Sequence, residues 1–251
     1  VIIPVYNAAS TLPLCLESLF AQTYGNIELI FIDDCSSDCS GDVIREYADK
    51  ANRQDIAVVI LQHESNKGVA AARNTGLDAA SGKYICWVDA DDCIEKDAIS
   101  RLVAIAEKND ADIVGFDWYL TFNKNERYMA QCPFSTPLEA MKNMMSGVMR
   151  WNLWLFMAKR SLYEDLHIRF VPGMNMGEDM LVTMQLFLHA QKVVHIAKAF
   201  YHYRQDNEAS VSRAFSDSNI HQVTENVRRA EQAILNSKYS NALSEYIDYL
   251  K

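Results

Sequence analysis

The segment Tyr84-Ile-Cys-Trp-Val-Asp-Ala-Asp-Asp92 joins a short apolar run to three carboxylates that lie within four residues. The run Tyr84–Val88 has the length and composition of a buried β-strand, so the acidic cluster follows the carboxyl end of that strand. Because residues i and i+2 of an extended segment point to the same side, Asp89 and Asp91 are predicted to converge on one ligand. A small set of oxygen ligands favours Mg²⁺ or Mn²⁺. The alternative is a solvated loop whose aspartates cap the next helix.

The chain around this segment alternates between strand and helix. Apolar runs rich in β-branched residues are followed by segments with helical periodicity. The predicted strands are Val1–Val5, Ile27–Ile32 and Ile56–Leu61, and the predicted helices are Ser10–Gln22, Ser40–Ala51 and Lys96–Lys108. Continuously apolar strands between amphipathic helices indicate an α/β fold with a mainly parallel sheet that is covered on both faces. Such sheets bind ligands at the carboxyl ends of their strands.

The second half of the chain has a less regular pattern. Strands are predicted at Asp112–Trp118, Leu153–Ala158, Val193–Ile196 and Phe200–Arg204, and helices from Thr136 through Met145, at Asp179–Ala190 and from Asp217 onward. The segment Asn123–Pro137 is polar and rich in turn residues, so it is expected to be irregular. Because no low-complexity linker separates the two halves, we expect one continuous fold.

The composition is that of a soluble globular protein. The 251 residues, 49% hydrophobic and 23% charged, exclude a disordered or collagen-like chain. The net charge of 24 − 33 = −9 argues against a general nucleic-acid binder, although it leaves room for a local basic pocket. No apolar run approaches the roughly 20 residues that cross a bilayer. Six cysteines without a CxxC pair are expected to be reduced thiols, and we expect a cytoplasmic location.

Polar residues also follow the first two predicted strands. The segment Asp33-Asp-Cys-Ser-Ser-Asp38 places acids where they can accept from the N–H groups of a base or from ribose hydroxyls. The alternative is a turn whose serines cap the next helix. The first strand ends at Pro4-Val-Tyr-Asn7, where Pro4 lacks an N–H for the ladder and Tyr6 could stack on a base.

An arginine stands in a helix whose other faces are nearly all small residues. The segment is Asn66-Lys-Gly-Val-Ala-Ala-Ala-Arg-Asn-Thr-Gly76. Its glycine and alanines let the helix begin close to another backbone. Arg73 in this setting requires an anion, and a phosphate or a base is a natural bidentate partner. The alternative is a structural ion pair with Asp34 or Asp89.

These four segments resemble, in order and spacing, the family 2 inverting glycosyltransferases with the GT-A fold. The resemblance is strong over residues 1–110 and weaker to residue 215. It implies a GT-A domain at residues 1–215, with a nucleotide-sugar-binding half at 1–110 and an acceptor-binding and catalytic-base half at 111–215. A helical extension at 216–251 follows. The fold implied is α/β, a Rossmann-like nucleotide-diphospho-sugar transferase fold, with a mixed, mostly parallel central sheet flanked by helices.

The resemblance also implies roles for individual residues of the first half. Pro4, Tyr6 and Asp34 would hold the nucleotide base, and Arg73 would contact the nucleotide. In the acidic cluster, Asp89 would lie near the ribose and the metal, and Asp91 would bind the metal.

Further roles implied by the resemblance fall in the second half. Met176-Gly-Glu-Asp-Met180 looks like the family's Gly-Glu-Asp segment, so Asp179 is the first choice for the catalytic base and Glu178 the second. A helix start favours the ionised carboxylate; helix capping alone is the alternative. Tyr201-His-Tyr-Arg204 and the later Ser210-Val-Ser212 look like a segment that closes over the diphosphate. There Arg204 would neutralise the leaving group and His202 would approach the metal, unless His202 is structural.

The activity implied is transfer of a sugar from a nucleotide-sugar donor, a UDP-sugar, to an acceptor hydroxyl with inversion and with Mn²⁺ or Mg²⁺. The acceptor would be a saccharide or a lipid-linked saccharide in cell-surface polysaccharide or glycolipid synthesis. One alternative is a non-catalytic nucleotide-sugar-binding subunit. The other is a sugar-1-phosphate nucleotidyltransferase, which would need a Gly-rich basic loop where this chain has Tyr6-Asn-Ala-Ala-Ser10. No nucleic-acid partner is expected, while peripheral contact with the inner face of the membrane and a homo-oligomer stay open.

Overall fold

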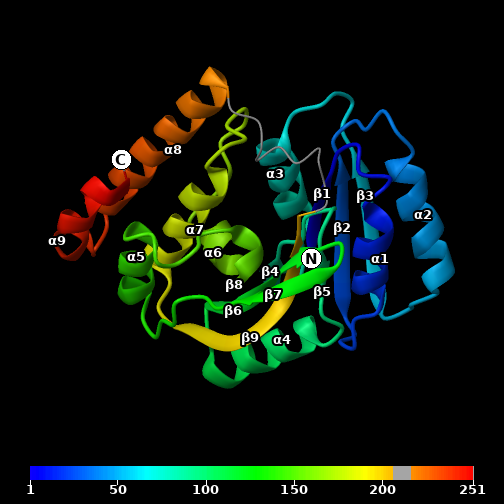
Figure 1. Ribbon diagram of the computed structural model, residues 1–251, viewed down its shortest axis with the longest axis horizontal. Coiled ribbons are helices and arrows are strands. Elements are labelled where there is room, and N and C mark those ends of the chain that lie inside the picture. The colour runs from blue at the N-terminus through cyan, green and yellow to red at the C-terminus, as the bar shows by residue number, and fades with distance from the viewer. Residues whose placement is uncertain (206–215, 251) are drawn as a thin grey trace.

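The first half of the chain forms a three-stranded parallel sheet between helices (Figure 1). The computed structural model describes residues 1–205 and 216–250. The strands, in the order β1-β2-β3, are β1 (Ile2–Val5), β2 (Ile27–Asp33) and β3 (Ile56–Gln62), and the helices are α1 (Leu12–Phe20), α2 (Ser40–Ala51) and α3 (Val69–Ala79). Figure 1 shows α1 and α2 on one side of the strands and α3 on the other. Because helices cover both faces, neighbouring residues of β1 such as Ile2 and Ile3 are both fully buried.

The second half forms a mixed sheet in the order β4-β8-β6-β9-β5, with β7 paired to β6. Its strands are β4 (Tyr84–Cys86), β5 (Cys93–Ile94), β6 (Ile113–Phe122), β7 (Asn125–Met129), β8 (Phe156–Lys159) and β9 (Val193–Arg204). Strands β6 and β9 are parallel, whereas the pairs β4–β8, β6–β8, β5–β9 and β6–β7 are antiparallel. A parallel bridge between Ile2 and Trp87 joins this sheet to the first one. The central sheet is therefore mixed, as predicted, with most of its parallel pairing in the first half.

Three predictions for the second half differ from the structure. The two strands expected at Val193–Ile196 and Phe200–Arg204 are one strand, β9, whose register with β6 shifts on both sides of Asp117. Such an irregularity breaks the two-residue alternation, and the sequence then shows a gap. The polar segment Asn123–Pro137 contains β7, an exposed edge strand that does not need apolar residues. The strand predicted at Leu153–Ala158 begins with a 3₁₀ turn, η1 (Leu153–Leu155).

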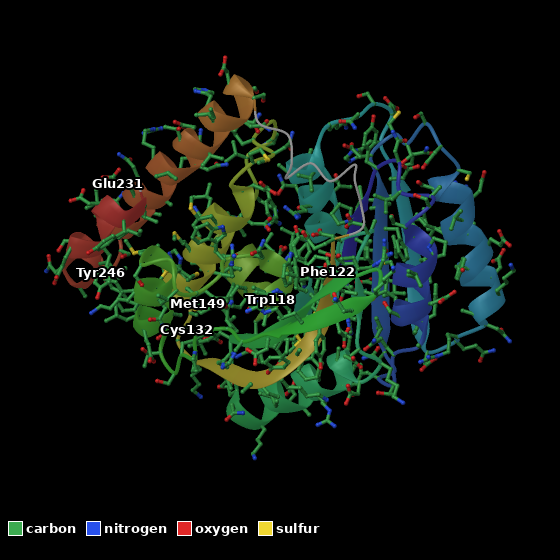
Figure 2. All side chains as sticks on the ribbon, in the orientation of Figure 1. Trp118, Phe122, Cys132, Met149, Glu231 and Tyr246 are labelled. Atoms are coloured by element: carbon green, nitrogen blue, oxygen red, sulfur yellow. The ribbon has the colours of Figure 1, made fainter. Side chains whose placement is uncertain are left out.

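The remaining helices cover the second sheet or, in the case of the last three helical segments of the chain, pack outside the helices that cover it. They are α4 (Ala98–Asn109), α5 (Pro137–Met145), α6 (Arg160–Asp165), α7 (Glu178–His189), α8 (Asp217–Leu235), α9 (Ser240–Leu243) and the 3₁₀ segment η3 (Ser244–Leu250). As predicted, Thr136 caps α5, since its side chain accepts from the N–H of Glu139. Figure 2 shows Cys132 and Met149 beside α5, and Met149 is buried there. None of the helices in residues 1–205 and 216–250 has the length and apolar character needed to span a membrane.

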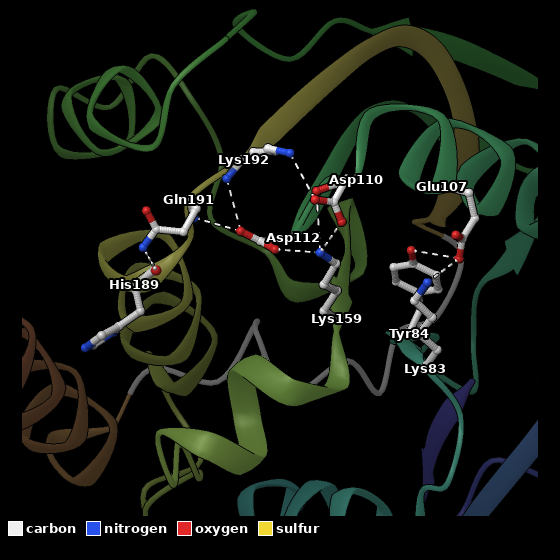
Figure 3. Close-up of polar contacts among 9 residues, drawn as sticks. All are labelled: Lys83, Tyr84, Glu107, Asp110, Asp112, Lys159, His189, Gln191 and Lys192. Carbon is white, nitrogen blue, oxygen red and sulfur yellow. Dashed lines mark hydrogen bonds and ion pairs between the residues drawn. The ribbon is translucent and has the colours of Figure 1, made fainter.

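A charged network fixes the amino ends of β6 and β9 (Figure 3). The ammonium group of Lys159 lies 2.9 Å from the Asp112 carboxylate and 3.0 Å from that of Asp110. The same Asp112 carboxylate accepts from the backbone N–H groups of Gln191 and Lys192, just before β9. Although burial acts to raise it, these donors hold the pKa of Asp112 below its ordinary value. The parallel pair is thus anchored at one end, and its carboxyl ends extend toward the acidic segment after β4.

Helix α3 lies directly on the first sheet at Gly76. A Cβ at this position would lie 2.4 Å from Cγ2 of Ile2 and 2.8 Å from Cδ1 of Ile32. Only glycine at this position therefore allows α3 to lie so close to β1 and β2. This close packing sets the distance between Arg73, on the same helix, and the ends of the strands.

We predict that Gly76→Val lowers the free energy of unfolding by about 1–3 kcal/mol, because the added methyl groups overpack a filled interface. Urea denaturation measures the change. The matched control is Gly82→Val, because a Cβ there meets no atom closer than 3.6 Å. Equal midpoints for the two variants would contradict the close packing of α3 on β1.

Candidate active site

The acidic segment after β4 is held in place by the end of β9. The N–H of Asp89 donates to the Tyr201 hydroxyl at 3.1 Å, and this hydroxyl donates to Asp92 at 2.7 Å. The other Asp92 oxygen accepts from the N–H of Arg204 at 2.8 Å. Burial, and next the charges of Asp89 and Asp91, raise the pKa of Asp92 well above its ordinary value. Asp92 therefore serves to tie the loop to β9, and Tyr201, which the sequence reasoning did not single out, is its main partner.

Arg73 lies at the centre of the site. Its side chain is 5% exposed, and the guanidinium donates through Nη1 to Glu178 at 2.6 Å and to Asp179 at 2.7 Å. Its Nη2 lies 3.5 Å from the carboxylate of Asp89. The guanidinium carbon is 5.5 Å from the ring centre of Phe170, within cation–π range. Arg73 thus joins carboxylates from both halves of the chain, and the ion pair with Asp89 is the alternative that the sequence left open.

Helix α7 supplies two of these carboxylates from its first turn. Glu178 and Asp179 are its first two residues and follow Gly177, whose φ of 76° lies in the left-handed region. Burial, and next the charge of Asp179, raise the pKa of Glu178 to about 8, while Arg73 opposes the shift. The Asp179 side chain is 17% exposed, and its Oδ2 accepts weakly from the N–H of Leu153 at 3.5 Å. Asp179 is therefore the more accessible of the two base candidates.

Asp34 is buried beneath the turn that precedes α3. Its oxygens accept from the N–H groups of Lys67 at 2.9 Å and Gly68 at 2.7 Å. The imidazole of His63 lies 2.6 Å from the same carboxylate and 2.9 Å from the hydroxyl of Thr75. These contacts fix the start of α3. The expected contact of Asp34 with the nucleotide base stays a prediction. Asp34 would make that contact in addition to its hydrogen bonds with the turn before α3.

The loops after β1 and β2 are joined next to the predicted base pocket. The side chain of Asn7 accepts from the N–H of Ser37 at 2.7 Å, and the Asn7 N–H donates to Ser36 at 3.0 Å. Tyr6 is 52% exposed beside these loops. Pro4 lies in β1 in register with Ile32 of β2. The position of Tyr6 leaves its ring available to a planar ligand.

The metal prediction rests on Asp89 and Asp91. Burial raises the pKa of Asp89 to about 6, Arg73 opposes this, and the charges of Asp91 and Asp179 add to it. A cation would relieve that repulsion, and two carboxylate oxygens suit Mg²⁺ or Mn²⁺. In the part of the chain that the structure describes, no group of three or more His, Cys, Asp or Glu side chains is arranged to hold a metal. Asp89 and Asp91 have the donor chemistry for such a cation, and the metal site itself stays a prediction.

His202 and Arg204, on the same face of β9, have different surroundings. Both ring nitrogens of His202 face carboxylates, Glu95 at 3.1 Å and Glu126 at 3.3 Å, and the ring stacks on Tyr119. Its role as a metal ligand stays a prediction. Arg204 reaches the carbonyl oxygen of Asp91 at 3.5 Å. The segment Ser210–Ser212 lies outside the described residues.

A family model decides the relationship of the chain to known proteins. The model described as glycosyl transferase family 2 matches residues 1–181. The chain belongs to this family.

Several relatives and solved structures are similar to this chain over most of its length. The uncharacterized glycosyltransferase EpsJ of Bacillus subtilis is 30% identical over 213 residues, which are 82% of this chain and 60% of EpsJ. The fold matches Staphylococcus aureus TarS, residues 1–349, solved with UDP-GlcNAc, at a TM-score of 0.83 with 22% identity over 99% of this chain and 70% of that one. The mannosyltransferase PcManGT of Pyrobaculum calidifontis, solved with GDP-Man and Mn²⁺, matches at 0.67 with 19% identity, over 99% and 67%. The predicted family and GT-A fold are confirmed.

We predict that Arg73→Met lowers the free energy of unfolding by about 3–5 kcal/mol at pH 8, because three carboxylates lose their buried counter-charge. Arg73 opposes the raised pKa values of Glu178 and Asp89, so its removal raises them further. Acids whose folded-state pKa is raised destabilise the fold increasingly as the pH rises. The deficit should therefore be smaller at pH 5 than at pH 8.

Urea denaturation of the wild type and of Arg73→Met at pH 5 and at pH 8 measures this difference. Arg101→Met is the control, because Arg101 forms a surface pair with Asp97. Such a pair contributes at most about 1 kcal/mol. A deficit of Arg73→Met that does not change with pH would contradict the buried ion cluster.

Proposed function

We propose that this chain transfers a sugar from a UDP-sugar to an acceptor hydroxyl with inversion, and that the reaction depends on Mn²⁺ or Mg²⁺. One observation carries the proposal. Asp89, at the strand end expected to receive the donor, and Asp179, the base candidate, meet on the guanidinium of Arg73. A donor-binding carboxylate and a proton acceptor are therefore adjacent, as a single displacement requires.

The donor class is supported by the family and by two structural neighbours. TarS was solved with UDP-GlcNAc, and PcManGT was solved with GDP-Man and Mn²⁺. In this chain, Pro4, Tyr6 and Asp34 would bind the nucleoside, with the ring of Tyr6 on the base. Arg73 would act from below this site through Asp89, since its own guanidinium is buried.

The diphosphate would lie against the segment between β4 and β5. Asp91 and Asp89 would hold the cation there. When bound, such a cation stabilises the charge of a departing nucleoside diphosphate. Arg204 is the last residue of β9, and its side chain reaches the carbonyl oxygen of Asp91, so its charge would lie near the diphosphate. His202 remains a candidate ligand.

Asp179 would take the proton of the acceptor hydroxyl. As that O–H bond breaks, the hydroxyl oxygen forms a bond to the anomeric carbon, and the bond from this carbon to the diphosphate breaks. Attack from the face opposite the leaving group inverts the configuration. Asp179 fits the role better than Glu178 because its side chain is the more exposed of the two, 17% against 11%.

The biological setting is proposed more broadly. The acceptor would be a saccharide or a lipid-linked saccharide in cell-surface polysaccharide or glycolipid synthesis, as the family resemblance implies. The same proposal includes a glycosyltransferase domain that ends at residue 215 and a helical extension that begins at residue 216. It also includes a cytoplasmic location, peripheral contact with the membrane and a homo-oligomer. A non-catalytic nucleotide-sugar-binding subunit is the second candidate, and turnover decides between the two.

We predict that UDP binds in the presence of Mn²⁺ and that EDTA or Asp91→Ala removes this binding. The measurement is calorimetric titration, with GDP as the competing nucleotide. Asp49→Ala, which removes an exposed carboxylate of α2, is the control for net charge. Binding that ignores both EDTA and Asp91 would overturn the metal assignment, whereas a preference for GDP would change the donor and keep the reaction class.

We predict that Asp179→Asn lowers kcat about 10²–10⁴-fold, because a general base of this kind contributes that much. The affinity for UDP should stay close to that of the wild type. Glu178→Gln is the matched control and should lose less. Product analysis by NMR gives the anomeric configuration, and a retained configuration would contradict the single displacement.

A further inference from the structure

The helix that carries the base candidate has no cap of its own. Its N-cap position is Gly177, and no side chain in the described part of the chain caps it. Most helices of the described residues likewise lack a side-chain cap, and the exceptions are α5, capped by Thr136, and α8, capped by Ser216. The contacts that fix the direction in which α7 begins are therefore sought outside the helix.

Helix α8 makes those contacts. The side-chain amide of Asn226 donates to the carbonyl of Met176 at 2.8 Å. The side-chain oxygen of Gln222 accepts from the N–H of Asn175 at 2.7 Å. Because Gln222 and Asn226 are four residues apart, they lie on one face of α8, and Figure 1 shows this helix beside α7. A Cβ at Gly177 would lie 3.5 Å from the backbone of Val223, so α8 lies directly against the turn.

The held turn is also connected to α3. The side-chain oxygen of Asn175 accepts from the N–H of Ala70, in the first turn of α3, at 3.1 Å. The close approach requires Gly68, since a Cβ there would lie 2.4 Å from the Asn175 amide. Helix α3 carries Arg73, which binds Asp179. The turn is thus fixed between α3 and α8. Because Asp179 lies just after this turn, the direction of its side chain is defined as well.

Asn226 holds the turn before α7, but its buried amide lowers the stability of the fold. Its side chain is fully buried, and among the described residues its Oδ1 has no hydrogen-bond partner. A buried acceptor without a partner is destabilising, and an apolar side chain of similar volume would avoid that cost. The contribution of the Asn226 amide is therefore the hydrogen bond that its N–H group donates to the carbonyl of Met176.

We propose that Gln222 and Asn226 are positioning residues for the catalytic base, acting through the turn Asn175–Gly177. This inference rests on the proposed function in one respect, that Asp179 accepts the proton. Misplacement of a base by about 1 Å can cost 10²-fold in rate. Loss of either contact should therefore lower kcat and leave donor binding unchanged, because neither Gln222 nor Asn226 is one of the predicted donor contacts.

Matched variants test the proposal. Gln222→Met and Asn226→Leu remove the contacts at similar volume. Gln222→Glu keeps an oxygen that accepts from Asn175, and Gln232→Met alters an exposed position of the same helix. We expect Gln222→Met and Asn226→Leu to lower kcat about 10- to 100-fold, with the UDP affinity within twofold of wild type. Gln222→Glu and Gln232→Met should stay within twofold in kcat.

A second measurement needs no substrate. Hydrogen–deuterium exchange of peptides covering residues 174–182 should be about tenfold faster in Gln222→Met and Asn226→Leu than in the wild type. Unchanged exchange, or a kcat that falls equally in Gln222→Glu and Gln232→Met, would overturn the positioning role. If the wild type turns over no donor while these exchange rates respond as expected, the proposed function fails and the fixed turn stands. If Asn226→Leu does not fold, the Gln222 pair decides.

Discussion

The buried guanidinium of Arg73 constrains the arrangement of everything around it. Because the side chain of Arg73 is only 5% exposed, its charge must be compensated within the protein. Glu178 and Asp179 of helix α7 and Asp89 of the loop after β4 do this. Glu178 lies 105 residues from Arg73 along the sequence. If α7 moved away from α3, the arginine and the carboxylates would be left unpaired in a poorly solvated space. The two halves of the site are therefore held at one separation by electrostatics.

The three aspartates of the acidic segment have become chemically different. Asp92 is buried and spends both oxygens on Tyr201 and Arg204 of β9. Asp89 is 34% exposed and faces Arg73. Asp91, between them, has its backbone carbonyl in reach of Arg204. Because one member fixes the loop to the sheet, the other two keep a defined position without a ligand. The proposed binding of a cation and a diphosphate would need that preorganisation.

Much of the fold and part of the site follow from the sequence. Residues 1–110 are well predicted because continuously apolar strands and amphipathic helices leave clear periodic signals, and the acids at the strand ends were located for the same reason. Strand β9 was divided in two because its irregularity beside Asp117 interrupts the alternation. Tyr201, His63 and Asn226 were missed because their roles depend on contacts between residues distant in the chain, which no local spacing records.

The site is connected by one charged and one neutral route, and the two respond to different conditions. The contacts of Arg73 depend on ionised carboxylates, so protonation weakens them. The contacts of Gln222 and Asn226 with the turn before α7 join amide groups to the backbone, and no ionisation changes them. At low pH the neutral route would keep the start of α7 in place while the charged one fails. Gln222 and Asn226 of α8 bond to the turn, so they fix the backbone from which Asp179 projects, whereas Arg73 fixes the Asp179 carboxylate itself.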